Sequence, residues 1–196
     1  MFYQFLHVLA RIIFMILGLK SKGLHNLPKK GPFIIAANHV SMWDPIVIAV
    51  VTPRPIHFMA KAEFFEKAWM AWFFRKINAF PVNRRAGDRT ALRYAMALLE
   101  KQEVLGIFPE GFRDRYGALK AKTGTAMIAV KTGAPIVPVA CVGTDRFIPF
   151  GWFRPLEVRI GKPIIMTEYV GQKVKSATLD AISEDIMNEV RTLLCK

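Results

Sequence analysis

The sequence predicts an α/β fold: a mostly parallel sheet flanked by helices, with an apolar N-terminal interfacial helix in front of it. Two observations predict the sheet. Short apolar runs recur along the chain, and segments with helical spacing lie between them. This alternation is typical of βαβ units, whose helices cover a parallel sheet. With 196 residues, we expect an N-terminal apolar helix over 1–22 and a single domain over 23–196.

The elements follow in order along the chain. The predicted strands cover 33–37, 56–60, 78–82, 104–108 and 135–141. The predicted helices between them cover 44–51, 62–76, 88–102 and 123–132. The helix over 88–102 has its apolar residues at helical spacing, and Asp88 is suited to cap its start. A run at 156–161 is expected to add an edge strand, and an amphipathic helix over 176–194 closes the chain.

Residues 2–19 are almost wholly apolar, with Arg11 near their middle. No basic residue precedes this run and no small-residue cleavage site follows it, which argues against a secretory signal peptide. The run is shorter than the roughly 20 apolar residues of a membrane-spanning helix, and a central arginine is costly there. Two interpretations stay open: a helix lying in the membrane interface, and a helix packed on the domain's own core.

The formal charge of +13 favours polyanionic partners: nucleic acid, anionic lipid headgroups or phosphorylated substrates. Because the basic residues are dispersed and no helix-turn-helix or zinc module is visible, we expect no nucleic-acid partner. Hydrophobic residues make up 53% of the chain, and the mean hydropathy of +0.25 suggests membrane contact. We therefore predict an anionic membrane surface as partner, at the cytoplasmic face of the cell membrane, with peripheral or monotopic attachment.

Cysteine and histidine usage sets two further expectations. The two cysteines, Cys141 and Cys195, give no disulfide framework, which fits a reducing compartment. The four histidines are scattered without zinc-ligand spacing, so we predict no metal and no cofactor.

The segment 62–76 carries an unusual number of aromatic residues beside Lys67, Arg75 and Lys76. Tryptophan together with lysine and arginine is typical of helices at a membrane interface. An aromatic core helix is the alternative, but core packing normally uses more leucine and isoleucine. We favour a role in facing the membrane or lining an acyl-chain site.

Candidate functional residues follow three of the predicted strands, namely His39 after 33–37, Arg84 after 78–82, and Glu110 to Arg113 after 104–108. In a parallel sheet these positions share the carboxyl edge, where open α/β sheets bind ligands. His39 and Asp44 suit a general base and the carboxylate that orients it. Arg84 and Arg113 are fork-shaped donors suited to a phosphate dianion.

Each of these residues also has a structural interpretation. Ser41 and Asp44 match a helix capping box, and a surface arginine is ordinarily only solvated. No Gly-x-Ser-x-Gly nucleophile elbow is present, and Cys141 lies inside a predicted strand. A histidine base without a protein nucleophile suits direct attack by a substrate hydroxyl on an activated carbonyl.

Five motifs, in order, carry a resemblance to a known family. Asn38 to Asp44 resembles the NHxxxxD block of the glycerolipid acyltransferases, the 1-acylglycerol-3-phosphate O-acyltransferase group. Phe80 to Arg84 and Phe108 to Arg113 are similar to its second and third blocks, and Val137 to Val139 to its fourth. Lys122-Thr123-Gly124 resembles the basic-glycine element before the fourth block. Ordered blocks are a far stronger signal than any one motif alone.

The resemblance implies acyl transfer from a thioester, acyl-CoA or acyl carrier protein, to the sn-2 hydroxyl of lysophosphatidic acid, giving phosphatidic acid. It implies that His39 takes the hydroxyl proton while Asp44 orients the imidazole. The remaining implied residues are substrate-binding Arg84, Glu110, Gly111, Arg113 and Lys122, and acyl-donor residues Val137, Pro138 and Val139.

Phe112 departs from the family pattern, which usually has threonine at that position, and leaves the acceptor open. Glycerol-3-phosphate, another lysophospholipid or a lyso-aminolipid are alternatives within the same chemistry. A basic, non-catalytic protein that binds membranes or nucleic acid is the alternative from another class.

Overall fold

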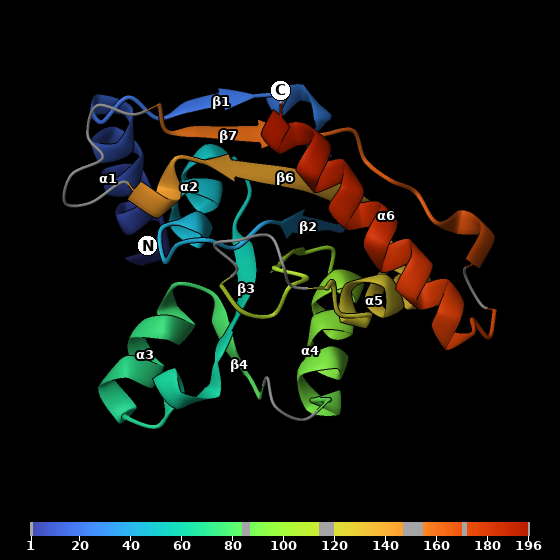
Figure 1. The fold of residues 1–196 in the computed structure, drawn as a ribbon. Helices are drawn as coiled ribbons and strands as arrows, with labels where there is room; N and C mark the ends of the chain where they lie inside the picture. Colours follow the sequence, from blue (N-terminus) through green and yellow to red (C-terminus); the bar gives the residue numbers. More distant parts are fainter. Residues whose placement is uncertain (1, 84–86, 114–119, 147–154, 170–171, 196) are drawn as a thin grey trace.

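The computed structural model describes residues 2–83, 87–113, 120–146, 155–169 and 172–195 (Figure 1). The helices are α1 (Phe2–Ile16), α2 (Asp44–Val51), α3 (Ala68–Lys76), α4 (Arg89–Glu100), α5 (Gly124–Thr132) and α6 (Ser176–Cys195). The strands are β1 (Lys20–Lys22), β2 (Phe33–Ala37), β3 (Ile56–Lys61), β4 (Ala79–Val82), β5 (Val104–Ile107), β6 (Ile136–Val142) and β7 (Glu157–Ile160).

The described strands form one seven-stranded sheet in the order β1-β7-β6-β2-β5-β3-β4. The run from β6 through β2, β5 and β3 to β4 is parallel throughout, and only the β6–β7 pair is antiparallel. The predicted α/β fold with a mostly parallel sheet is therefore confirmed. Strand β2 lies centrally between β5 and β6, so the residues that follow it emerge in the middle of the carboxyl edge.

Two hydrophobic clusters, one on each face of the sheet, hold the layers together. Ile34 and Ala36 of β2 pack in the cluster formed with α4, α5 and α6, whereas Ile35 and Ala37 pack in the cluster formed with α1 and α2. Figure 1 shows the same division of helices around the sheet. Because both faces are covered, β2 is a continuous apolar run instead of an alternating one.

Three details of the sheet and helices differ from expectation. The strand predicted at 156–161 is not at the sheet edge, because β7 lies between β6 and β1. The N-terminal helix expected over 1–22 ends at Ile16, and Lys20–Lys22 forms the edge strand instead, paired in parallel with β7. The helix predicted over 62–76 is split into a 3-10 turn at Ala62–Phe65 and α3, because the chain is extended at Lys67.

Among the described residues, helix α1 contacts the rest of the domain through one side. Phe14 is buried in the core, the His7 ring nitrogen lies 2.9 Å from the carbonyl oxygen of Ala49 in α2, and the Phe2 ring lies 5.5 Å from that of Trp72 in α3. Thus α1 does pack on the domain, while its opposite face stays exposed. None of the described helices is both long enough and apolar enough to span a bilayer.

Candidate active site

The side chains of His39 and Asp44 form a buried pair just beyond the end of β2. The Nδ1 atom of His39 lies 2.9 Å from Oδ2 of Asp44, which itself is the first residue of α2. The same Oδ2 accepts hydrogen bonds of 2.8 Å from the backbone N–H groups of Val40 and Ser41. Asp44 is completely buried and His39 is 6% exposed. Asp44 therefore holds the turn before α2 and orients the imidazole. It does not cap the helix as the sequence suggested, because Trp43 is the N-cap residue and no side chain caps α2.

Two further contacts hold His39, one at its backbone and one at its ring. The His39 N–H donates to Oε2 of Glu110 at 2.8 Å, and the ring of Phe108 stacks on the imidazole with centroids 4.1 Å apart. Both partners lie in the segment directly after β5, the strand next to β2. The expected meeting of the loops after β2 and β5 at one edge of the sheet is thus observed.

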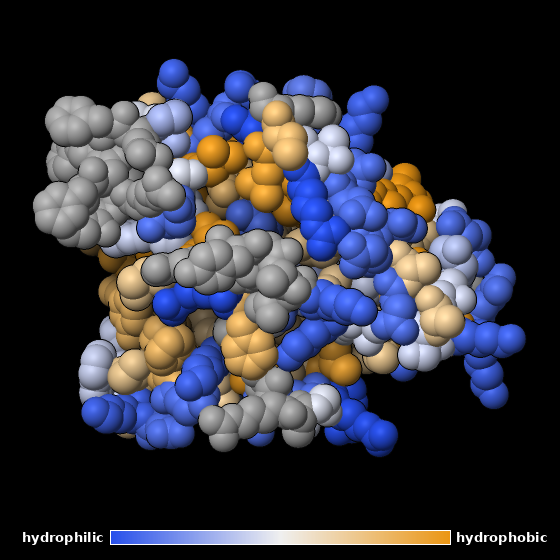
Figure 2. Space-filling model, viewed as in Figure 1, coloured by the Kyte–Doolittle hydropathy of each residue, from blue (hydrophilic) through white to orange (hydrophobic). Residues whose placement is uncertain are grey.

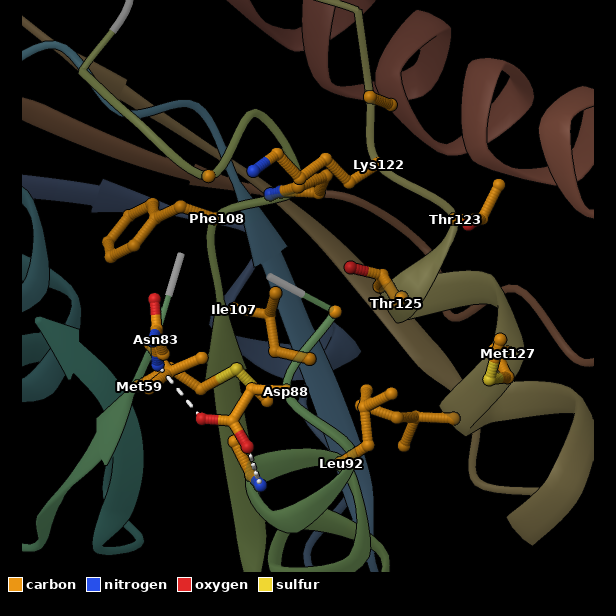
Figure 3. A pocket seen from close by; sticks show the side chains of 18 of the residues that line it. Met59, Asn83, Asp88, Leu92, Ile107, Phe108, Lys122, Thr123, Thr125 and Met127 are labelled. Atoms are coloured by element: carbon orange, nitrogen blue, oxygen red, sulfur yellow. Dashed lines mark hydrogen bonds between the residues drawn. The ribbon is translucent and has the colours of Figure 1, made fainter. Parts of the chain in front are cut away.

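Phe108 also lines a pocket of about 570 Å³ (Figure 3). In Figure 3, Lys122 lies at one end of the pocket and Leu92 at the other, with Ile107 between them. Its apolar lining residues include Met59, Leu92, Ile107, Met127 and Ile128. Lys122, Thr123 and Thr125 form its polar end, whereas Asn83 and Asp88 lie beside Met59 and Leu92 (Figure 3). Apolar walls with a cation at one end suit an amphiphilic ligand.

The polar end of the pocket combines a cation with the start of a helix. Lys122 precedes α5, whose first residues also line the pocket, and the side chain of Thr123 does not cap that helix. Thr125 is buried, and among the described residues its hydroxyl has no hydrogen-bond partner. A cation, a helix start and a free hydroxyl favour an anionic group at this end.

Gly111 lets the backbone turn beside Lys122. Its φ of +75° is unfavourable for residues with a Cβ, and a Cβ built there would lie 2.9 Å from Cε of Lys122. We expect Gly111→Ala to cost roughly 1 kcal/mol of folding free energy. Because Lys122 must also move, and Lys122 is a predicted substrate-binding residue, we expect weaker binding of the phosphorylated acceptor. Acceptor and thioester KM values, with a thermal melt, check this. An unchanged acceptor KM would show that Lys122 does not hold it.

The structure does not bring the remaining predicted site residues that it describes into the pocket or into contact with His39. Arg84 lies outside the described residues. Arg113 is exposed at the same edge as Glu110. Val137, Pro138 and Val139 are buried in β6, paired with Ile35–Ala37 of β2, and are not among the residues that line the pocket. Their predicted contact with the acyl donor stays a prediction.

Ionisable groups near the site have definite charge states. Hydrogen bonds from the N–H groups of Asn83, Ala91 and Thr90 lower the pKa of the Asp88 carboxyl, so it is ionised at neutral pH. Burial raises the pKa of the Cys141 thiol well above its ordinary value, with a smaller effect from the charge of Asp44. A neutral thiol is a poor nucleophile, which argues against acyl transfer through Cys141.

Two residues of the site were missed as functional from the sequence. Phe108 stacks on His39 and lines the pocket, and the amide of Asn38 contacts the backbone of Cys141 in β6. Both residues belong to the motifs quoted above, which was the available signal. Their contacts join different strands, so no residue spacing in the sequence indicates them.

The fold itself orients the pair of His39 and Asp44, and this is the arrangement that a general base and its orienting carboxylate require. Residues 18–142 match the sequence model of the Acyltransferase family. Over 177 residues the chain is 32% identical to the 1-acyl-sn-glycerol-3-phosphate acyltransferase of Bacillus subtilis, covering 90% of this chain and 88% of that one. The chain belongs to the Acyltransferase family, which confirms the resemblance described above.

Two more similarities extend over almost the whole chain. The 1-acyl-sn-glycerol-3-phosphate acyltransferase of Streptococcus pneumoniae is 26% identical over 98% of this chain and 73% of its own. The crystal structure of the 1-acyl-sn-glycerophosphate (LPA) acyltransferase PlsC from Thermotoga maritima superposes with a TM-score of 0.74. That match has 29% sequence identity and covers 97% of this chain and 79% of the other.

Proposed function

We propose that the protein transfers a fatty acyl group from an acyl thioester to the sn-2 hydroxyl of 1-acylglycerol-3-phosphate, giving phosphatidic acid for phospholipid biosynthesis. The observation that carries this proposal is the buried pair of His39 and Asp44, 2.9 Å apart, beside a pocket with a cationic end. The relatives that bear this activity by name match most of the chain, which supports the choice of substrate.

The chemistry needs one base and no covalent intermediate on the protein. The imidazole Nε2 of His39 accepts the proton of the acceptor hydroxyl as that oxygen attacks the thioester carbonyl. Asp44 accepts from Nδ1–H and stabilises the positive charge that forms on the ring. When the tetrahedral intermediate collapses, the carbon–sulfur bond breaks and the leaving thiolate takes the proton from His39.

The acceptor phosphate is assigned to the polar end of the pocket. Lys122 supplies a cation, and the first turn of α5 with the Thr125 hydroxyl supplies neutral donors. Arg113, exposed at the same sheet edge, and Arg84 are proposed to complete the binding of the dianion. Acyl-CoA and acyl carrier protein both remain as donors in this proposal.

The test of this function is an assay with purified protein, palmitoyl thioester and a panel of lysolipids, with products identified by mass. The panel holds lysophosphatidic acid, glycerol-3-phosphate, lysophosphatidylcholine and a lyso-aminolipid. Phosphatidic acid from lysophosphatidic acid is the expected product. Acylation of another acceptor alone would contradict the proposed substrate, and binding of DNA without any acyl transfer would contradict the enzyme.

We further propose that the acceptor is taken from an anionic membrane surface, at the cytoplasmic face, onto which α1 and α3 dock. The outer face of α1 and the neighbouring α3 expose large apolar side chains: Phe5, Val8, Leu9, Ile12, Ile13, Met15, Ile16, Trp69, Trp72 and Phe73. Figure 2 shows apolar side chains with hydrophilic ones beside them on the surface over α3. Arg11, Lys67 and Arg75 are exposed next to these residues and suit contact with lipid phosphates.

Replacing Ile12 and Ile16 together by glutamate is expected to reduce binding to vesicles of phosphatidylglycerol and phosphatidylcholine at least about tenfold. These side chains are 53% and 78% exposed, so their replacement leaves the core intact. Vesicle co-sedimentation measures the effect. The matched control is Ile165→Glu, which changes an equally exposed isoleucine beyond β7 and is expected to leave binding unchanged. Equal loss in both variants would remove α1 from the docking surface.

A further inference from the structure

The turn that carries His39 is held by both strands that flank β2. On one side, Glu110 in the turn after β5 accepts the His39 N–H at 2.8 Å. On the other side, Asn38 makes a paired contact with the backbone of Cys141 in β6. Its Nδ2 donates to the Cys141 carbonyl at 3.2 Å, and its Oδ1 accepts the Cys141 N–H at 2.8 Å.

The Asn38 contact lies at a point where the sheet alone does not fix the chain. The pairing of β2 with β6 runs from Ile34 to Ala37 and ends at the Ala37–Val139 pair, whereas β6 continues to Val142. Asn38 is the first residue past the end of β2 and is 5% exposed. Its side-chain amide takes the place of the next main-chain pair, and it does so immediately before His39.

From this geometry we infer that Asn38 is a positioning residue for the acyl transfer proposed above. It acts through the backbone: with Glu110 on the opposite side, it fixes the Cα of His39, and Asp44 then fixes the ring. Both backbone groups of Cys141 would lose their partner without the amide, which gives the turn freedom to move. A general base works only within hydrogen-bond reach of its proton, so such movement lowers the rate of the chemical step.

The same arrangement gives Glu110 a positioning role, because its carboxylate binds the backbone N–H of His39. Glu110 is 6% exposed, and its Oε2 is occupied by the His39 N–H. A carboxylate placed this way fixes the peptide of His39 from the β5 side, as Asn38 does from the β6 side. Neither side chain needs to touch substrate for this role.

The test is steady-state kinetics of Asn38→Ala and of the isosteric Asn38→Asp, alone and combined with Asp44→Asn. Aspartate keeps the acceptor for the Cys141 N–H and loses the donor to its carbonyl. We expect kcat of each single variant to fall about 10- to 100-fold, as for supporting residues of other catalytic groups, with both KM values within twofold. In the Asp44→Asn background the further loss should shrink to less than about threefold, because the two residues act through the same imidazole.

The control is Ser183→Ala, which removes a buried hydroxyl bonded to the Leu179 carbonyl within α6. It is expected to lower the melting temperature without changing kcat. An unchanged kcat in both Asn38 variants, a rise in KM alone, or the same fold-loss with and without Asp44 would overturn the inference, as would failure of both variants to fold. If the wild-type protein transfers no acyl group, the proposed function fails. If the wild-type protein is active and the Asn38 variants match it, the proposed function stands and this inference fails.

Discussion

Replacement of His39 by alanine is expected to abolish acyl transfer, with kcat falling at least about 10³-fold. The imidazole is the group that the fold orients for proton transfer, through Asp44 on one edge and Phe108 against its face. Without it, the acceptor hydroxyl must lose its proton to water, which is a far weaker base at neutral pH. Turnover at saturating thioester and lysophosphatidic acid measures the effect.

The His39→Ala protein must remain folded for this result to be informative. His39→Gln keeps a polar side chain of similar size against Phe108 and serves as the second variant. Both should retain the far-UV circular dichroism spectrum and bind lysophosphatidic acid with unchanged affinity, since the cation at Lys122 is untouched. Normal turnover by either folded variant would exclude His39 as the base.

Asp44→Asn is expected to lower kcat by a similar amount, roughly 10³- to 10⁴-fold, in line with the same change in the aspartate of a serine-protease triad. An asparagine oxygen can still accept the N–H groups of Val40 and Ser41, which now donate to Oδ2. What it lacks is the negative charge that stabilises the imidazolium. The KM values for both substrates should change little.

Asp44→Ala separates the two roles of this carboxylate. It removes the charge and the acceptor together, so Val40 and Ser41 lose a partner that is completely buried. We expect kcat to fall as in Asp44→Asn, with an additional loss of about 1–3 kcal/mol in the free energy of unfolding. Equal stability of the two variants would show that the turn does not depend on Asp44. An Asp44→Asn protein with near-normal kcat would remove the charge from the mechanism.

The part of the fold that sequence could predict is the part where local pattern and tertiary environment agree. The fully apolar run 33–37 predicts a buried strand, and β2 covers those residues with every one buried. Asp88 predicts the start of α4, and its carboxylate does accept the N–H groups of Thr90 and Ala91. Strand order along the carboxyl edge then brought His39 and Glu110 together, as the alternation of strands and helices implied.

The sequence could not predict what depends on distant partners. Lys20-Ser21-Lys22 has no apolar pattern, and it is a strand only because β7 supplies its hydrogen bonds from more than a hundred residues away. Likewise, the hydrogen bond from the His39 N–H to Oε2 of Glu110 joins residues 71 positions apart, and the predicted role of Glu110 toward substrate stays a prediction. Neither contact has a local sequence signal, because each is set by which strands become neighbours.

The account depends on direct attack by the acceptor hydroxyl, with His39 as base and no acyl group passing through the protein. Intact-protein mass spectrometry after incubation with palmitoyl thioester alone tests this most directly. The expected result is an unmodified protein mass at every time point, followed by phosphatidic acid once lysophosphatidic acid is added. A palmitoylated protein that forms at the rate of turnover and then passes its acyl group to the acceptor would contradict it.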